Sequence, residues 1–158
     1  MNRGFEKVSF PQFRMDIVDN KELYDEYNLP VRKTKNSAGY DFYAIEDIVL
    51  KPGETKKIPT GVKTYMNNDE VLMLVVRSSM GFKYNIRLCN QVGIIDGDYY
   101  NNESNEGHIW VRLQNHGDEE VVIPQGNAFV QGIFTKFLIV DNEEKIEKER
   151  TGGFGSTS

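Results

Sequence analysis

The stretch that decides the fold is VLMLVV, residues 71–76, a nearly continuous apolar run that ends at Arg77. A run of this length without Gly or Pro is typical of a β-strand that is buried on both faces. Further along the chain, aliphatic side chains alternate with Trp, Arg and Gln over residues 109–114 (IWVRLQ), which predicts a strand with one buried face. We therefore expect a chain built mostly of strands.

Turn-forming clusters separate the predicted strands at fairly regular spacing. They are rich in Gly, Pro, Asn and Asp, and read KPGET, NND, GDYYNNESNEG, NHGDEE and IPQGN. Short strands joined in this way are typical of a sandwich, a jelly roll or a barrel. A single short helix is expected over residues 20–28 (NKELYDEYN), with Asn20 as its N-cap and Pro30 ending the run.

Length and composition limit the class of protein. A chain of 158 residues is expected to form one domain with its own core. No apolar run approaches the roughly 20 residues of a membrane span. The first ten residues, MNRGFEKVSF, contain no secretory apolar region, so a cytoplasmic location is expected.

The charge and the cysteine content limit the kinds of ligand that the chain is expected to bind. The net charge of -5 argues against a broad nucleic-acid-binding face but allows a local basic pocket for a phosphate ligand. Cys89 is the only cysteine, which excludes an internal disulfide, and His108 and His116 beside it are too few for a zinc site. We expect a small-molecule partner and neither nucleic-acid nor membrane binding.

Two stretches carry polar groups at the start and the end of predicted strands. In SAGYDFYA, residues 37–44, a small-Gly-aromatic-Asp series enters a strand, and the simpler reading is a turn before an edge strand. In RSSMGFK, residues 77–83, the buried strand ends in a guanidinium, two hydroxyls and a glycine. Such donors suit phosphate oxygens, although the serines could equally cap a short helix.

Two further stretches combine glycine with aromatic and acidic side chains. In NQVGIIDGDYYNN, residues 90–102, a hairpin could present Asp96, Asp98 and Tyr99 together, to activate water and shape a sugar pocket, or the aspartates could only hold the turn. The tail RTGGFGSTS, residues 150–158, has a composition that favours disorder. A flexible glycine-rich arm of this kind could close over a ligand, with Phe154 on a base and hydroxyls on phosphate.

In this order, the stretches resemble the five motifs of the trimeric dUTPase family. SAGYDFYA, RSSMGFK and NQVGIIDGDY are similar to the first three, GNAFVQGIF (residues 126–134) to the fourth and the tail to the fifth. The resemblance runs from about residue 29 to the C-terminus. It implies a jelly-roll-like or distorted β-barrel fold and a homotrimer that exchanges C-terminal arms. The domain would span residues 1–149, with an N-terminal extension of about residues 1–13, and residues 150–158 would be a flexible lid.

The resemblance also implies an activity, the hydrolysis of dUTP to dUMP and pyrophosphate, which limits uracil incorporation into DNA and supplies dUMP for thymidylate synthesis. Asp96 would orient and deprotonate the attacking water. Tyr99 would lie under the deoxyribose and leave no room for a 2′-hydroxyl. Asn90 would read the uracil edge, since an amide offers both a donor and an acceptor. Phe154 would stack over the uracil.

Other positions matching the motifs are implied to bind the substrate. They are Gly93 and Ile95 in the third motif, Arg77, Ser78, Ser79 and Gln131 at the phosphate chain, and Arg150, Gly155, Ser156 and Thr157 in the arm. Mg²⁺ is expected to arrive on the triphosphate and to be held through waters, without a direct protein ligand. Asp41 would either orient that hydration or support the site structurally.

The sequence departs from the family pattern in the second to fifth motifs, and the departures in the fourth and third matter most for the site. The fourth motif usually reads Gly-Asp-Arg-Ile-Ala-Gln, and here Asn127 and Ala128 replace the acid and the arginine. Three cations are candidates to compensate for this loss, namely Lys83, Arg87 and Arg112. The third motif lacks the usual Gly-Glu after its tyrosine and is followed by an insertion, residues 101–107.

Two other functions stay open. A dCTP deaminase, which has the same fold and needs no zinc, would require a glutamate base on the strand after the third motif. This chain has Asp96 in the hydrolase position, and Glu103 and Glu106 lie in the insertion. A non-catalytic regulator that binds nucleotide or a protein partner is favoured by the loss of the fourth-motif arginine, whereas Asp96 and the lid argue against it.

Overall fold

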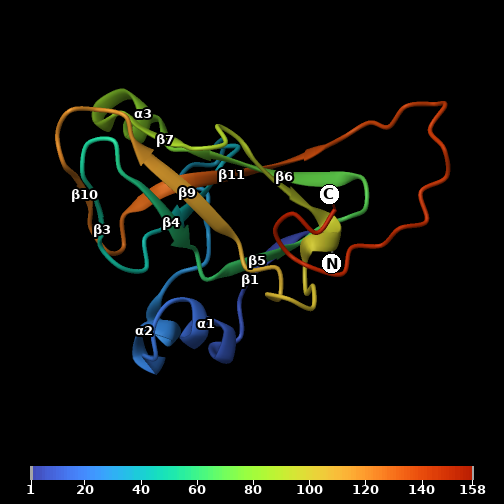
Figure 1. Ribbon diagram of the computed structural model, residues 1–158, viewed down its shortest axis with the longest axis horizontal. Coiled ribbons are helices and arrows are strands. Elements are labelled where there is room, and N and C mark those ends of the chain that lie inside the picture. Colours follow the sequence, from blue (N-terminus) through green and yellow to red (C-terminus); the bar gives the residue numbers. More distant parts are fainter. Residues whose placement is uncertain (1, 158) are drawn as a thin grey trace.

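The computed structural model describes residues 2–157, so Ser158, the last residue of the predicted arm, lies outside it. The described chain is built mainly of short strands (Figure 1). The strands are β1 (Gly4–Lys7), β2 (Tyr40–Tyr43), β3 (Ile48–Leu50), β4 (Thr55–Pro59), β5 (Val62–Tyr65), β6 (Glu70–Val76), β7 (Ile86–Leu88), β8 (Gly93–Asp96), β9 (Trp110–Asn115), β10 (Val121–Ile123) and β11 (Ala128–Lys136). The helices are α1 (Phe10–Asp16), α2 (Lys21–Glu26), α3 (Ser78–Tyr84) and the 3₁₀ turn η1 (Gly97–Tyr99).

Two antiparallel sheets enclose the main core. The larger has the strand order β2-β11-β6-β8, and the smaller has the order β4-β9-β7. In Figure 1 the smaller sheet crosses in front of β11, and side chains of both sheets belong to one buried cluster. Its members include Phe42, Leu72, Leu74, Leu88, Leu113 and Phe129. The predicted mostly β, jelly-roll-like class is confirmed.

The two strands singled out in the sequence are both present. In β9, Val111 and Leu113 are buried while Arg112 between them is exposed, as the alternation predicts. β6 lies between β11 and β8, with Leu72 in the core. Its burial on both faces is wrong for most of the strand in the single chain, because Met73 and Val75 on the opposite face are only half-buried, although Val71 on that face is buried. One face of the larger sheet therefore packs on the core and the other is partly open.

The N-terminal segment is a structural part of the domain. α2 follows the predicted N-cap Asn20, whose side chain accepts from the N–H of Leu23 at 3.0 Å, but it ends at Glu26, earlier than expected. The sequence analysis missed α1, although Ser9 as N-cap and Pro11 in the first turn are recognisable start signals. β1 pairs with β5, and both helices lie below the sheets in Figure 1 over a small second core. The longest α-helices described, α1 and α3, have seven residues, too few to cross a bilayer.

A buried histidine joins α1 to the main domain. His108 is fully buried, and its Nε2 accepts from the N–H of Gly61 at 2.8 Å. Its Nδ1 lies 2.6 Å from Oδ2 of Asp16, the last residue of α1. Since Nε2 is an acceptor, the neutral ring carries its proton on Nδ1 and donates it to Asp16. Burial lowers the pKa of His108 below its ordinary value, and Asp16 opposes that shift.

This lowered pKa predicts acid sensitivity of the fold. A histidine in the unfolded chain titrates near ~6.5, so the unfolded state binds the extra proton first and stability falls as the pH drops from there towards the folded pKa. We expect the urea midpoint of unfolding to fall between about pH 7.5 and 5.5, and to fall less in His108→Gln. The exposed His116 offers the control, because His116→Gln should keep the full acid sensitivity. An equal fall in His108→Gln would contradict the assignment.

Candidate active site

The acidic end of β8 is formed differently from the predicted hairpin. β7 pairs with β9 whereas β8 pairs with β6, so the chain crosses from the smaller to the larger sheet between these strands. The crossing is a tight turn, in which Gln91 has a φ of 65° and its N–H donates to the carbonyl of Leu88 at 2.9 Å. β8 then ends at Asp96, and η1 follows at once with Asp98 and Tyr99. A strand end and a turn thus bring the two carboxylates and the ring together.

An apolar cavity of about 470 Å³ lies beside this strand. Four predicted site residues line it, namely Asn90, Gly93, Ile95 and Phe154, with Leu74, Leu88, Ile94 and Trp110 among the other walls. Gly93 packs closely, since a Cβ there would lie 3.1 Å from the Cβ of Leu74. An apolar cavity with an amide at its edge suits a planar base that needs a few directed hydrogen bonds.

The Tyr99 ring lies next to the arm. Tyr99 is 6% exposed, and its hydroxyl donates to the carbonyl of His108 at 2.7 Å. Burial raises the pKa of Tyr99, so the hydroxyl keeps its proton. The ring of Phe154 lies 6.1 Å from that of Tyr99, tilted by 52°, and is largely exposed. The arm of the chain therefore reaches the same end of β8 as the candidate base.

Arg150 holds this arm against the two carboxylates. Its Nη2 donates to Asp96 Oδ2 at 3.0 Å and its Nε to Asp98 Oδ1 at 2.9 Å, while Nη1 donates to Ser156 Oγ at 3.3 Å. Thr157 is exposed. The guanidinium predicted to face phosphates is thus paired with carboxylates in the single chain, and a phosphate would compete with them for it.

The predicted phosphate-binding residues gather at a second, polar cavity of about 330 Å³. Its lining comprises Lys33, Ser37, Gly39, Asp41, Arg77, Ser78, Ser79 and Gln131. The Asp41 carboxylate is buried, and its Oδ1 lies 3.2 Å from Arg77 Nε, which orients the guanidinium. Gly39 allows Gln131 to approach, because a Cβ at Gly39 would lie 2.1 Å from Gln131 Oε1. The first, second and fourth motifs therefore meet at one place.

The serines of the second motif begin a helix, as the alternative interpretation expected, but they do not cap it. Arg77 is the N-cap residue of α3, and no side chain caps the helix by a hydrogen bond. Ser78 and Ser79 are the first helical residues and line the polar cavity. Helix formation and phosphate binding are thus compatible readings of the same residues.

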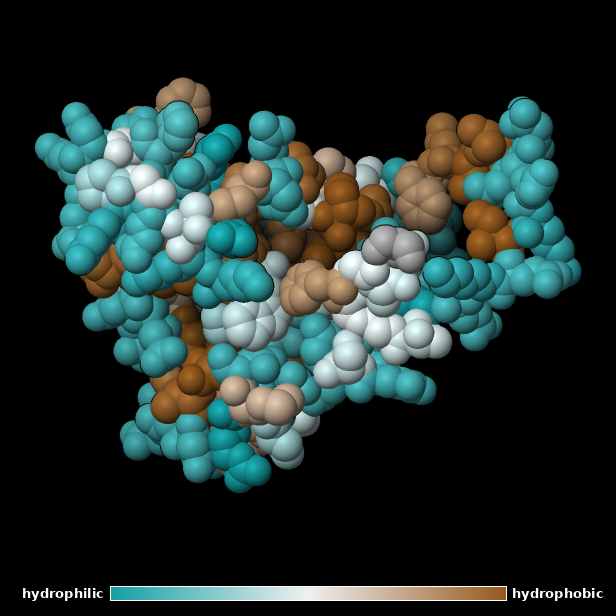
Figure 2. All heavy atoms as spheres, in the orientation of Figure 1, coloured by the Kyte–Doolittle hydropathy of each residue, from teal (hydrophilic) through white to brown (hydrophobic). Residues whose placement is uncertain are grey.

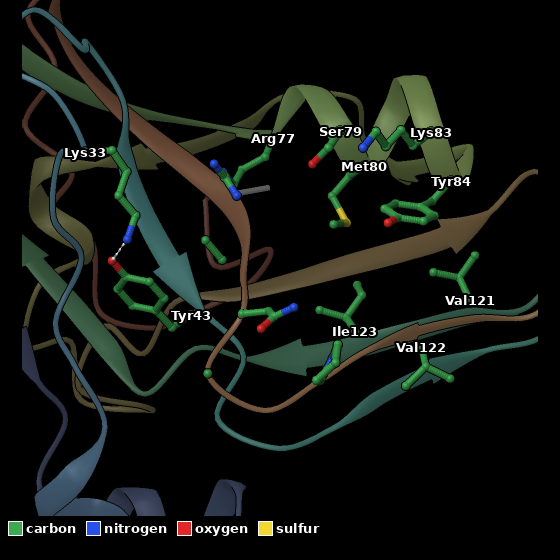
Figure 3. Close-up of a pocket in the computed structure, with 14 residues that line it drawn as sticks. Lys33, Tyr43, Arg77, Ser79, Met80, Lys83, Tyr84, Val121, Val122 and Ile123 are labelled. Atoms are coloured by element: carbon green, nitrogen blue, oxygen red, sulfur yellow. Dashed lines mark hydrogen bonds between the residues drawn. The ribbon is translucent and has the colours of Figure 1, made fainter.

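Cations surround the position of the missing arginine. Figure 3 shows a neighbouring cavity of about 610 Å³, lined by Lys33, Arg77, Lys83 and Ala128 among others. The other two residues that were candidates to compensate for the missing arginine, Arg87 and Arg112, lie away from this cavity. Arg87 donates to Gln114 at 2.8 Å, and Arg112 lines the apolar cavity.

Lys33 was missed by the sequence analysis, although it lies in the basic run RKTK just before the first motif. It lines both the polar cavity and its neighbour. Its Nζ donates to the Tyr43 hydroxyl at 3.0 Å, and Figure 3 shows it across from Arg77. Lys33 and Lys83 are therefore the two lysines placed to replace the charge lost at Ala128.

The apolar and polar cavities have no lining residue in common. The single chain therefore places the predicted base-binding and phosphate-binding residues at separate sites. An apolar cavity with an amide in its lining and a separate polar cavity lined by cations, on a strand-built domain, form the arrangement expected of a nucleotide-handling β protein.

Comparison with known proteins identifies the family within this class. Residues 25–158 match the dUTPase family, and the chain belongs to this family. Deoxyuridine 5'-triphosphate nucleotidohydrolase of Lactococcus lactis is 54% identical over 131 residues, which cover 82% of this chain and 87% of that protein. The crystal structure of dUTPase from Streptococcus mutans aligns with a TM-score of 0.72 and 41% identity over 88% of this chain and 99% of that one.

A more distant structure shares the fold. A mutant dUTPase from phage phi11 of Staphylococcus aureus, described with a coordinated structural Mg(II) ion, aligns with a TM-score of 0.68 and 17% identity over 94% of this chain and 98% of that one. The family match begins at residue 25, so β1 and α1 lie outside it.

Proposed function

We propose that the chain hydrolyses dUTP to dUMP and pyrophosphate. The observation that carries the proposal is the placement of Asp96, an accessible carboxylate at the end of a strand whose Gly93 and Ile95 line the apolar cavity. Membership of the dUTPase family and the activity named for the Lactococcus lactis relative support it.

The proposed chemistry is an in-line attack of water on the α-phosphorus. Asp96 accepts a proton from the water while the water oxygen forms the new bond to phosphorus. The bond from phosphorus to the bridging oxygen breaks, and the electron pair leaves with pyrophosphate. A carboxylate fixed beside a correctly placed water gains from orientation as well as from proton transfer. The 55% exposed side chain of Asp96 leaves room for that water.

Base and sugar selection would use the apolar cavity. Asn90 at its edge offers the donor and acceptor that uracil needs. Thymine would be rejected because the segment at Gly93 would leave no space for its 5-methyl group. Tyr99 would lie under the deoxyribose and reject ribose, and Phe154 would cover the base.

The triphosphate would occupy the polar cavity, with Arg77, Ser78, Ser79 and Gln131 as donors and the arm residues Arg150, Gly155, Ser156 and Thr157 closing over it. Mg²⁺ would be carried in on the phosphates, and when bound it would neutralise their charge. Asp41 fits a supporting role, because it is buried and paired with Arg77 rather than open to an ion.

We propose that the active unit is a homotrimer whose sites lie between subunits, with arms exchanged. The separation of the two cavities within one chain supports a site completed by a second copy. The segment after β11 offers apolar surface for such contact, visible as a brown patch on the right of Figure 2. It comprises Phe137, Leu138, Ile139 and Val140, which are all exposed.

A nucleotide panel tests the function. We expect pyrophosphate release with magnesium from dUTP, and little from UTP, dTTP or dCTP, at protein concentrations where sedimentation shows a trimer. Ammonia from dCTP would instead assign a deaminase. No turnover of any nucleotide by a folded trimer would assign a binding or regulatory role and make the loss at Ala128 decisive.

A further inference from the structure

The insertion, residues 101–107, is a closed loop that packs against Tyr99. The N–H of Asn101 donates to the carbonyl of Glu106 at 2.8 Å, and the N–H of Glu106 donates to the carbonyl of Asn102 at 3.1 Å. Gly107 has a φ of 83°, and a Cβ there would lie 2.7 Å from the Tyr99 carbonyl oxygen. The loop therefore has a fixed shape directly beside the ring that is proposed to lie under the sugar.

Two asparagines of this loop hold Tyr99 at both of its ends. Asn105 Nδ2 donates to the Tyr99 hydroxyl at 2.9 Å, and that hydroxyl donates in turn to the carbonyl of His108. Asn102 Nδ2 donates to the backbone carbonyl of Tyr99 at 2.8 Å. The phenol oxygen is thereby fixed between one donor and one acceptor, and the side chain cannot swing away from this position without losing buried hydrogen bonds.

The orientation of the Asn105 amide is set by its other bonds. Its Oδ1 accepts from Asn102 Nδ2 at 2.8 Å and from the N–H of Gly107 at 3.1 Å. Since the oxygen is occupied by two donors, the NH₂ group must face Tyr99.

The other side of the loop is anchored to α1. Glu106 accepts from the N–H of Ser9 at 3.1 Å and from the Ser9 hydroxyl. Lys63 Nζ lies 3.3 Å from the same carboxylate. The loop is thus clamped between the N-terminal segment and Tyr99.

We infer that Asn105 is a positioning residue for sugar selection: it fixes the Tyr99 ring in the place where it rejects a 2′-hydroxyl. The inference rests on the proposed function and assigns to the insertion a share in substrate specificity. A loop with only a structural role would affect dUTP and UTP alike.

The test compares kcat/KM for dUTP and UTP in four proteins, namely the wild type, Asn105→Leu, Tyr99→Phe and the double variant. Each single change removes the same hydrogen bond, so each should lower the dUTP preference about tenfold. The double variant should lower it by less than the two single losses combined, because both changes remove this shared bond. Tyr99→Phe also removes the bond to the His108 carbonyl, and Asn105→Leu also removes the bonds to Asn102 and Gly107. Glu103→Gln, at an exposed position of the same loop, should keep the preference.

The possible results distinguish a failure of the role assigned to Asn105 from a failure of the proposed dUTP hydrolysis. An unchanged preference in Asn105→Leu, or additive losses in the double variant, would overturn the role of Asn105. If Asn105→Leu does not fold, Tyr99→Phe decides, because it breaks the bond and leaves the loop in place, and an unchanged preference there would overturn the inference. A wild-type protein that turns over neither nucleotide would instead refute the proposed function itself.

Discussion

Asp96→Asn should lower dUTP hydrolysis by at least ~10²-fold, the loss typical of a missing general base. Asparagine has nearly the same shape and can still accept a hydrogen bond, but it cannot take the proton from water. Nucleotide affinity should therefore be retained, and calorimetry with dUTP and magnesium can measure it because turnover is slow. Single-turnover pyrophosphate release measures the chemical step.

Asp98→Asn is a closely matched control. Both carboxylates are accessible, with side chains 55% and 61% exposed, and both bind the same Arg150 guanidinium. A loss of contact with the arm would affect both variants equally, whereas loss of the base would affect only Asp96→Asn. If the two variants lose activity to the same extent, the effect belongs to the arm, and Asp96 is not the base.

Phe154→Ala should lower kcat/KM for dUTP by about 5- to 150-fold, since stacking of a base on an aromatic ring is worth about 1–3 kcal/mol. The thermal midpoint should not change, because the ring is 69% exposed and lies outside the main core. Phe82→Ala is the matched control, as Phe82 on α3 is 93% exposed and lines neither candidate cavity. Normal turnover by Phe154→Ala would refute the lid role of the arm.

The sequence predicted those parts of the fold that depend on local patterns. The alternation in β9 and the cap at Asn20 were confirmed because each is decided within a few residues. The predicted hairpin over residues 90–102 was wrong because pairing depends on distant partners: β8 pairs with β6 and β7 pairs with β9, in each case with other helices and strands between them in the chain. α1 was missed although its signals at Ser9 and Pro11 are local.

The candidate site was only partly accessible to sequence reasoning. Motif order identified Asp96 and Arg77, whose roles stay predictions. The lysine opposite Arg77 was not found, because only the tertiary fold brings Lys33 and the second motif to one cavity. The contacts of residues 101–107 were likewise not predictable from the sequence. Hydrogen bonds such as that from Asn105 to the Tyr99 hydroxyl depend on loop geometry, which composition does not specify.

The contact between Ser9 and Glu106 links the N-terminal segment to the loop of residues 101–107, and this link bears on how the two evolve. Ser9 lies before the segment that matches the family, and Glu106 lies in the loop that the sequence analysis interprets as an insertion. Without the loop the Ser9 hydroxyl would still cap the N–H of Gln12, and without Ser9 the Glu106 carboxylate would keep Lys63, so each group loses one partner and keeps another. Loss of one segment would therefore weaken the contact without leaving a buried polar group unpaired, and related proteins that carry one segment without the other are expected.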